Sequence, residues 1–419
     1  MLKDYSKHPC FNINSRHQYG RLHLPVAPKC NIQCNYCNRK FDCVGESRPG
    51  VSSAILSPGQ AVYYVEQALK KHPEISTIGI AGPGDPLANP LETLETLKQV
   101  KMKFREMIFC LASNGLNLPP YVAELADLGV SHVTITVNAV DPEIGGSIYA
   151  WVRDGKIIYR GKDAAKFLWE RQQAAIAGLK KHGITVKVNS IIIPGVNDSH
   201  LAEVARQMKT LGADLMNCIP IYPTTGTVFE DLKAPGVEEI SWIRRVTGKY
   251  LPQMEHCARC RADAVGLLGK ELDRETYLFL RDSAIMPLNP GENRPYIAVA
   301  SLEGMLVNQH LGEAEELLIY GKDQSGYYLA DTRRTPAPGN AKQRWHDLAA
   351  ILRDCRVILV SAAGDPPREV LKQEGIRLIE MEGLIEQGLE AVFSGHENSL
   401  KKRSPPGCSG CKGSGTGCG

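Results

Sequence analysis

Strand-like and helix-like segments alternate along most of the first 250 residues, and this alternation constrains the fold more than any other feature. Apolar runs predict buried strands at 21–27, 75–81, 107–112, 133–137, 185–193 and 215–222. Amphipathic segments between them predict helices at 58–71, 91–104, 121–128, 164–181, 199–211 and 238–250. About six βα units indicate parallel strands with helices outside, so we expect an α/β fold with a partial or complete TIM-like (βα) barrel.

Cys30, Cys34 and Cys37 lie close together in the loop after the first predicted strand. Three thiolates on a short loop can bind three irons of a four-iron, four-sulfur cluster and leave the fourth iron open to another ligand. The C-x3-C-x2-C spacing, with Tyr36 before the last cysteine, resembles the radical S-adenosylmethionine (SAM) signature. A structural zinc site is the alternative, although such sites usually use C-x2-4-C pairs that complete a tetrahedron.

A glycine-rich loop with Gly82, Pro83, Gly84 and Asp85 follows the second predicted strand. Glycine lets a ligand lie against the backbone, and the position of the loop resembles the motif that binds the SAM amino group in radical SAM enzymes. We expect Tyr36 to pack against the SAM adenine or ribose. Further candidates for the SAM site stand at or near the ends of later strands: Ser113, Asn114, Asn138, Asn189 and Ser190. Each of these polar residues alone fits a capping role equally well.

Composition excludes several classes of function. The net charge of this 419-residue chain is +3, which implies no nucleic-acid partner. The start of the chain lacks the apolar run of a signal peptide, and no segment has about 18 uncharged apolar residues, so we expect a cytoplasmic protein without a membrane partner. In a reducing compartment, metal ligation explains the 13 cysteines better than disulfides do.

More cysteines are present than one cluster can use. Cys257 and Cys260 form a C-x2-C pair without a second pair nearby, so their metal partners must be remote residues or inorganic sulfide. The available protein partners are Cys10, His17, Cys43, Glu46 and Cys110. We expect Cys218, inside the sixth predicted strand, to be an inert small apolar residue.

Several segments resemble the NifB family of nitrogenase cofactor maturases. They are residues 8–10, 27–40, 46–51, 81–86, 151–153 and 159–161, and the likeness covers about residues 5–285. The resemblance implies a radical SAM enzyme with a resident [4Fe-4S] cluster and two further [4Fe-4S] substrate clusters. Such an enzyme uses SAM-dependent methyl transfer and hydrogen abstraction by a 5′-deoxyadenosyl radical. It fuses the two substrate clusters, with a SAM-derived carbide and an added sulfur, into the eight-iron precursor (NifB-co) of the nitrogenase cofactor.

The same resemblance implies a grouping of the remaining ligands and a set of partners. Cys10, His17 and Cys110 would help hold one substrate cluster, and Cys257 and Cys260 would help hold the other. Cys43 and Glu46 are candidates for a bridging or labile ligand. The implied partners are an iron–sulfur cluster donor, a low-potential electron donor, a NifX-type carrier and the NifEN scaffold.

A proline-rich, polar linker at 287–295 separates residues 1–286 from a predicted small α/β domain at 296–396. Residues 296–301 and 305–308 predict a hairpin, and a strand at 357–361 lies between predicted helices at 342–353 and 367–374. Around His310 this domain resembles the NifX-like cofactor-binding family, which implies a ribonuclease H-like fold and a cluster ligand at His310. The tail at 397–419, with Cys408, Cys411 and Cys418, should be disordered alone, and its cysteines either hold iron or are dispensable.

Two alternatives to the cofactor maturase stay open. A non-catalytic iron–sulfur carrier or scaffold would account for the C-terminal domain and the tail, but it has no use for a SAM site. A radical SAM enzyme acting on an organic substrate would account for the cysteine triad, but the additional cysteine and histidine ligands argue against it.

Overall fold

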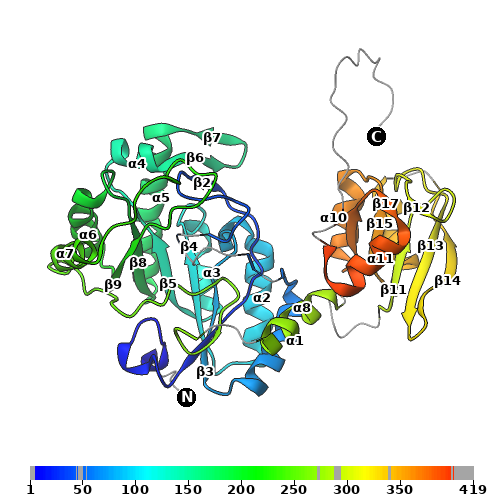
Figure 1. Cartoon of the computed structure of the whole chain (residues 1–419), viewed down its shortest axis with the longest axis horizontal. Coiled ribbons are helices and arrows are strands. Elements are labelled where there is room, and N and C mark those ends of the chain that lie inside the picture. The colour runs from blue at the N-terminus through cyan, green and yellow to red at the C-terminus, as the bar shows by residue number, and fades with distance from the viewer. Residues whose placement is uncertain are drawn as a thin grey trace, which may run out of the picture. The chain divides into compact units, whose positions relative to one another are not determined.

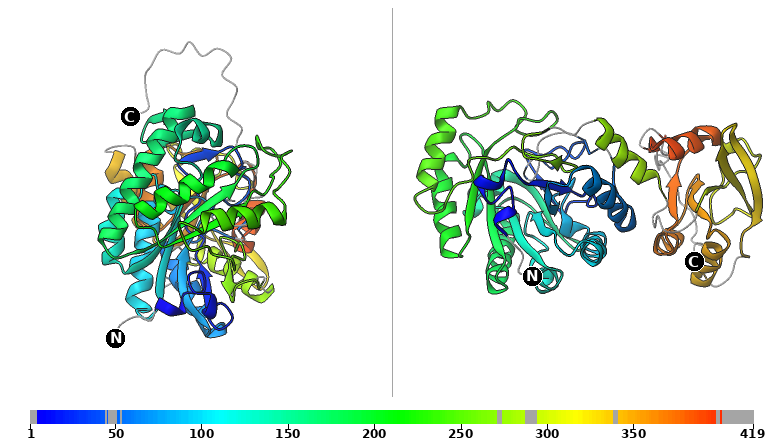
Figure 2. Two further views of the ribbon diagram at one scale, coloured as in Figure 1. Left: turned by 90° about the vertical axis from the view of Figure 1, so that its left-hand side faces the viewer. Right: turned by 90° about the horizontal axis from the view of Figure 1, so that it is seen from below.

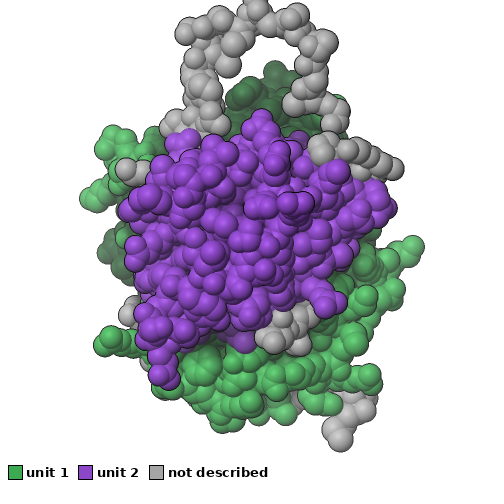
Figure 3. Space-filling view, turned by 90° about the vertical axis from the view of Figure 1, so that its right-hand side faces the viewer, with its two compact units in different colours: residues 1–280 green, residues 281–419 purple. Residues whose placement is uncertain are grey.

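The computed structural model describes residues 5–43, 45, 51–52, 54–270, 274–286, 294–337, 341–397 and 400. The chain forms two compact units, Met1–Leu280 and Arg281–Gly419, which Figure 3 shows in separate colours. The boundary falls within α8 (Arg274–Ile285), just before the predicted linker. Residues 287–293 of that linker and 401–419 of the tail, with Cys408, Cys411 and Cys418, lie outside the described residues. No helix of the described ranges is long and apolar enough to cross a membrane.

A seven-stranded sheet forms the centre of the first unit, in the order β10-β1-β3-β4-β5-β8-β9. Its strands are β1 (Gly20–His23), β3 (Ile75–Ile80), β4 (Ile108–Ser113), β5 (Val130–Thr136), β8 (Thr185–Ile192), β9 (Leu215–Pro220) and β10 (Val265–Gly266). Neighbours from β1 to β9 are parallel, whereas β10 runs antiparallel to β1. Among the described strands, β9 and β10 are the two edges and do not pair with each other, so the expected barrel is confirmed as a partial one.

Helices cover the outer face of this sheet, as Figures 1 and 2 show. They are α1 (Pro58–Lys71), α2 (Pro90–Lys103), α3 (Val122–Asp127), α5 (Gly161–Lys181), α6 (Leu201–Thr210) and α7 (Val237–Thr247). α1 begins as predicted, because Ser57 and Gln60 form a capping box before Pro58. Leu22, Ile78 and Val133 are fully buried. Since side chains alternate along a strand, the residues on either side of each of these apolar positions in β1, β3 and β5 face the inside of the partial barrel.

A small antiparallel sheet that the sequence pattern did not predict joins the cysteine loop to a later hairpin. It consists of β2 (Ile32–Cys34), β6 (Tyr149–Asp154) and β7 (Ile157–Tyr159), in the order β2-β6-β7. Ile32 pairs with Val152, and Cys34 pairs with Tyr149. α4 (Pro142–Ile148) precedes this hairpin. The cysteine loop is therefore tied to a segment more than a hundred residues away.

The second unit is an α/β domain, as expected. Its five-stranded sheet has the order β14-β13-β11-β15-β16, with strands β11 (Tyr296–Val299), β13 (Glu316–Asp323), β14 (Gly326–Arg334), β15 (Cys355–Val360) and β16 (Arg377–Glu380). Its other helices are α9 (Ala341–Ile351), α10 (Asp365–Gln373) and α11 (Ile385–Ser394).

The hairpin predicted from residues 296–301 and 305–308 is wrong. β11 pairs with β13 and β15, whereas β12 (Leu306–Val307) pairs with β17 (Gly383–Leu384). Ala298 belongs to one apolar cluster of this unit, and Ile297 and Val299 belong to another. A strand that is buried on both faces is typical of the inside of a sheet, and β11 takes that place between β13 and β15.

Candidate functional site

Backbone pairing and one side chain shape the cysteine loop. β2 pairs with β6, and the side-chain amide of Gln33 donates to the carbonyls of Cys34 (3.0 Å) and Cys37 (2.6 Å). Cys30, Cys34 and Cys37 thereby line one cavity of about 430 Å³, hereafter the triad cavity. Asp85, which follows β3, lines the same cavity, which therefore lies at the carboxyl ends of the parallel strands, where active sites of βα folds form.

The glycine-rich loop packs against the cysteine loop without room for a side chain. A Cβ atom on Gly84 would lie 2.1 Å from the carbonyl oxygen of Lys29, so only glycine fits there. The N–H of Asp85 donates to the same carbonyl at 2.8 Å. Gly82 has a φ of +135° and, like Pro83, lies outside the lining of the triad cavity, whereas Gly84 is part of it.

The carboxylate of Asp85 joins two loops. It accepts hydrogen bonds from the Ser113 hydroxyl (3.0 Å) and from the N–H groups of Asn114 (2.6 Å) and Leu87 (2.8 Å). Burial raises the pKa of Asp85, while these hydrogen bonds lower it. Asn114 also lines the cavity, with its Nδ2 3.9 Å from Sγ of Cys30. Asp85 and Ser113 thus brace the predicted SAM site, and Asn114 faces it.

Tyr36 lines the triad cavity, and its hydroxyl accepts a hydrogen bond from Nδ2 of Asn138 at 2.9 Å. Oδ1 of Asn138 accepts from the N–H of Ile191, so this amide is engaged at both ends. The hydroxyl of Ser190 donates to the Val137 carbonyl at 2.5 Å. Asn138 and Ser190 are fully buried and lie outside the lining of the triad cavity, so the structure places both predicted SAM residues behind it.

The donor set of the triad cavity fits an iron–sulfur cluster. Burial raises the pKa of Cys30 to about 11 and raises the pKa of Cys34 well above its ordinary value, so a cationic partner is needed to ionise these thiols. In the described part of the chain, no three His, Cys, Asp or Glu side chains converge as ligands of a single metal ion. A four-iron cluster takes one thiolate on each iron, and the three cysteines line one cavity together.

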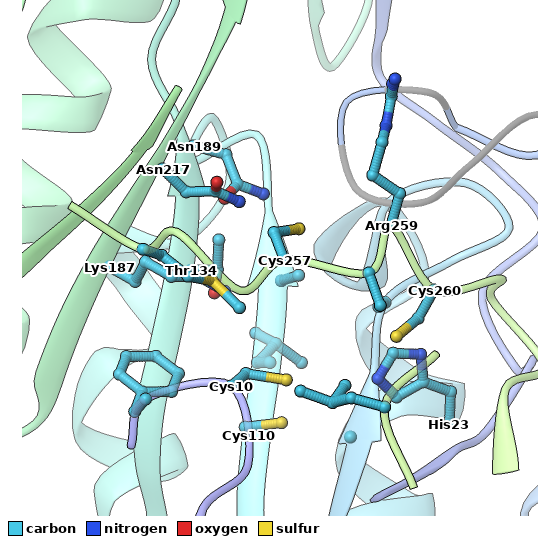
Figure 4. A pocket seen from close by; sticks show the side chains of 18 of the residues that line it. Cys10, His23, Cys110, Thr134, Lys187, Asn189, Asn217, Cys257, Arg259 and Cys260 are labelled. Carbon is cyan, nitrogen blue, oxygen red and sulfur yellow. The ribbon is translucent and has the colours of Figure 1, made fainter. Parts of the chain in front are cut away.

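A second cavity of about 710 Å³, hereafter the barrel cavity, lies on the inner face of the sheet. Cys10, Cys110, Cys257 and Cys260 line it, and Figure 4 shows their sulfur atoms turned toward a common space. Gly79 makes room for them, because a Cβ atom there would lie 2.7 Å from Sγ of Cys110. Burial raises the pKa of Cys10 to about 11 and that of Cys110 to about 12. Four cysteines far apart in sequence thus share one space.

His23 lines the barrel cavity, and His17 does not. Nδ1 of His23 donates to the Arg261 carbonyl at 2.9 Å, so Nε2 is the nitrogen left for a metal. Burial lowers the pKa of His23 to about 4, which keeps the imidazole neutral. His17 is exposed, and its Nε2 accepts from Arg16 at 2.9 Å. Alternation in β1 is the signal that sequence reasoning missed, because the buried Leu22 turns its neighbour His23 inward.

Polar side chains on the inner strand faces complete the barrel cavity. Asn189, which we predicted for the SAM site, lines this cavity instead and accepts from Nδ2 of Asn217 at 3.2 Å. Oδ1 of Asn217 is buried without a partner in the described structure. Lys187 also lines the cavity, with Nζ 5.1 Å from the centre of the Phe11 ring. Lys187 and Asn217 sit inside strand patterns that appear merely amphipathic in the sequence.

Gly45 belongs to the lining of both cavities. Its carbonyl accepts hydrogen bonds from Nδ2 of Asn189 (3.3 Å) and from the hydroxyl of Thr136 (3.4 Å). Cys43 lines the triad cavity, and a Cβ atom on Gly45 would lie 3.7 Å from its Sγ. Gly45 therefore stands between the two cavities, whereas Glu46 lies outside the described residues.

Two other predicted positions lie elsewhere. Cys218 is fully buried in β9, with its Sγ 3.7 Å from the Thr247 hydroxyl, as expected of a small apolar residue. His310 belongs to the second unit, where its Nδ1 accepts from the N–H of Gly312 at 3.0 Å. Its Nε2 is the nitrogen available to a ligand there.

Comparison with known proteins gives consistent matches. Residues 24–208 match the Radical SAM superfamily, and residues 293–395 match the family described as Dinitrogenase iron-molybdenum cofactor. Among solved structures, methylornithine synthase has a TM-score of 0.38 at 13% identity, over 61% of this chain and 77% of that one. The FeMo cofactor biosynthesis protein NifB of Klebsiella pneumoniae is 40% identical over 88% of this chain and 86% of its own length. The NifB protein of Chlorobaculum tepidum is 56% identical over the full length of both chains, and this chain therefore belongs to the family of FeMo cofactor biosynthesis proteins NifB.

Proposed function

We propose that this protein is a radical SAM enzyme of nitrogen fixation that builds the eight-iron precursor of the nitrogenase cofactor. The observation that carries the proposal is the shared wall at Gly45, with the cysteine triad on one side and a four-cysteine cavity on the other. A reactive SAM fragment formed in the triad cavity would need to pass only Gly45 to reach iron–sulfur substrates in the barrel cavity.

The triad cavity is the proposed SAM site. Cys30, Cys34 and Cys37 would hold the resident [4Fe-4S] cluster, which supplies the electron that cleaves SAM when the cluster is bound and reduced. Tyr36, Gly84 and Asn114 face the space beside the triad and are placed to orient SAM. Methyl transfer followed by hydrogen abstraction by a 5′-deoxyadenosyl radical is the chemistry that we assign to this site.

The barrel cavity is the proposed site of the two [4Fe-4S] substrates. We assign Cys10 and Cys110 to one substrate cluster, with His23 as its third ligand in place of His17, and we assign Cys257 and Cys260 to the other. Cys43 faces the triad cavity from the shared wall and is placed to act as a labile ligand during transfer. Fusion of the two clusters with a carbide and an added sulfur would then occur where their ligands already surround a common space.

The second unit suggests a carrier role in addition to synthesis. Residues 293–395 match a family named for the dinitrogenase iron-molybdenum cofactor, and His310 is a candidate ligand for the product. We propose that this unit receives product and passes it to a NifX-type carrier or the NifEN scaffold. A cluster donor and a low-potential electron donor are the other partners, and the oxygen sensitivity of exposed clusters favours the cytoplasm.

Anaerobic reconstitution with iron and sulfide, followed by SAM and dithionite, tests the proposal. We expect about twelve irons per chain from three four-iron clusters. Turnover should release both 5′-deoxyadenosine and S-adenosylhomocysteine, because one SAM donates a methyl group and another supplies the radical. A protein that binds iron without cleaving SAM would be a carrier. Cleavage without S-adenosylhomocysteine would favour an enzyme acting on an organic substrate.

A further inference from the structure

A buried arginine lies directly against one sulfur of the barrel cavity. Arg21 is only 2% exposed, and its Nε and Nη2 lie 3.2 Å and 3.1 Å from Sγ of Cys260. Both nitrogens therefore donate to the same sulfur. Arg21 stands two residues before His23 on the inner face of β1, and the sequence alone shows no sign of this contact.

The third nitrogen of the Arg21 guanidinium is hydrogen-bonded to backbone carbonyls at β10. Nη1 of Arg21 donates to the carbonyls of Val265 (3.1 Å) and Leu267 (2.9 Å) and also to that of Gly266. These residues form and follow β10, the strand that pairs with β1. Since the side chain cannot rotate without breaking these bonds, the two donors toward Cys260 are held in a fixed direction.

The contact between Arg21 and Cys260 is electrostatic, because Arg21 carries a positive charge. Its partners in the described structure are three carbonyl groups and one sulfur, so Cys260 is the partner that can carry negative charge. A buried guanidinium is costly without a counter-charge. The thiolate form of Cys260, which is the form that binds iron, satisfies this requirement.

The other cavity sulfurs lack such a partner. No arginine or lysine of the described residues donates a hydrogen bond to Cys10, Cys110 or Cys257. Lys187 acts on Cys10 and Cys110, and Arg259 acts on Cys257, through charge and without a hydrogen bond to the sulfur. Among the four cavity sulfurs of the described structure, Cys260 therefore differs in accepting two hydrogen bonds from a buried guanidinium.

We propose that Arg21 positions Cys260 and raises the reduction potential of the substrate cluster held by Cys257 and Cys260. This inference rests on the proposed function, which puts that cluster there. Hydrogen bonds to a ligating sulfur withdraw electron density from iron and stabilise the reduced cluster, and the positive charge acts in the same direction. One electron from the external reductant enters the cluster, and no proton moves and no bond is broken.

The test isolates this cluster in the full-length protein. Substitution by Ala of the triad, of Cys10, Cys43 and Cys110, and of the tail cysteines gives a background that keeps Cys257 and Cys260 as its candidate cluster ligands; the triad is Cys30, Cys34 and Cys37, and the tail cysteines are Cys408, Cys411 and Cys418. Arg21→Gln and Arg21→Lys are then made in this background, with Arg244→Gln as the matched control. Arg244 also donates to a backbone carbonyl, that of Cys218 at 3.2 Å, but it lines neither cavity. After anaerobic reconstitution with iron and sulfide, the reduced cluster is followed by EPR in a redox titration with dithionite.

We expect a change in the reduced-to-oxidised ratio at the potential where the background is half reduced. Arg21→Gln should lower this ratio about tenfold, equivalent to about 59 mV for one electron. Arg21→Lys, which keeps the charge but loses the two-point contact, should lower it less, and Arg244→Gln should leave it unchanged. Unchanged ratios in both Arg21 variants at normal iron content would overturn the role of Arg21.

Two further outcomes remain distinguishable. If Arg21→Gln fails to fold because its bonds to β10 are lost, Arg21→Lys decides, and an unshifted potential in that variant overturns the inference. A folded background that binds no iron would contradict the assignment of a cluster to Cys257 and Cys260. That result would contradict both the proposed function and this inference.

Discussion

The two cysteine-lined cavities are built in opposite ways. The triad cavity takes its sulfur ligands from a single loop, and Cys34, Cys37 and Tyr36 belong to a continuous apolar cluster. The barrel cavity draws its cysteines from three separate parts of the chain and places the polar side chains of Lys187 and Asn217 among them. A site whose sulfur ligands all come from one short loop suits a cofactor that stays bound. A site with dispersed ligands and buried polar groups suits a charged substrate that must be released.

The largest expected effect separates the two cavities directly. Replacing Cys30, Cys34 and Cys37 by Ala should abolish SAM cleavage and remove about four of about twelve irons, because the open iron vanishes with its ligands. Iron analysis and detection of 5′-deoxyadenosine measure both effects. Cys218→Ala, which changes a buried thiol outside both cavities, should leave the iron content unchanged. Methionine release by the triple variant would show that the triad is not the SAM site.

The second effect concerns the barrel cavity alone. Replacing Cys257 and Cys260 by Ala should also remove about four irons, but reductive SAM cleavage should persist because the triad is intact. The eight-iron product should be absent from the EPR-monitored reaction, since only one substrate cluster is left. If the variant still formed product, the second substrate would have to be held elsewhere.

The third effect uses the two histidines as a matched pair. We expect pulsed EPR of the wild-type protein to detect a nitrogen hyperfine coupling on a substrate cluster. His23→Ala should remove this coupling, because His23 lines the barrel cavity with Cys110 and its Nδ1 is bonded to the Arg261 carbonyl. His17→Ala should keep the coupling, since His17 is exposed and bonded to Arg16. The opposite result would restore the ligand set that includes His17.

The fourth effect is on stability at the wall of the triad cavity. Gly84→Ala would place a Cβ atom 2.1 Å from the Lys29 carbonyl oxygen, and we expect the free energy of unfolding to fall by about 1–3 kcal/mol. Gly178→Ala, in α5, would meet Val122 at an ordinary 3.4 Å and should change it by less than about 1 kcal/mol. Chemical denaturation of the cluster-free proteins measures both, and equal values would refute the steric argument.

The smallest effect tests whether the second unit shares in the chemistry. We expect the full-length His310→Ala protein to cleave SAM at the wild-type rate and to retain less eight-iron product after gel filtration. A protein ending at Met286 should likewise cleave SAM, because every cavity residue of the triad precedes that position. Loss of cleavage in a folded, cluster-loaded shortened protein would make the second unit part of the catalytic site.

Features that depend on neighbouring residues could be predicted from the sequence. The βα alternation predicted the parallel strands of the partial barrel, since periodicity is a local property of each segment. The triad was equally visible, because Cys30, Cys34 and Cys37 lie in one loop. Family resemblance then supplied the radical SAM function, and the glycine at position 84 agrees with the close approach seen in the structure.

The contacts between residues far apart in the chain became visible with the three-dimensional structure. It places His23 in the barrel cavity and His17 outside it, puts Asn189 in the barrel cavity and sets Arg21 against Cys260. It also replaced the predicted hairpin at β11 by pairing with β13 and β15. These outcomes depend on strand register and on contacts across hundreds of residues, and a one-residue change of register would turn every inward side chain outward. No local pattern carries that information.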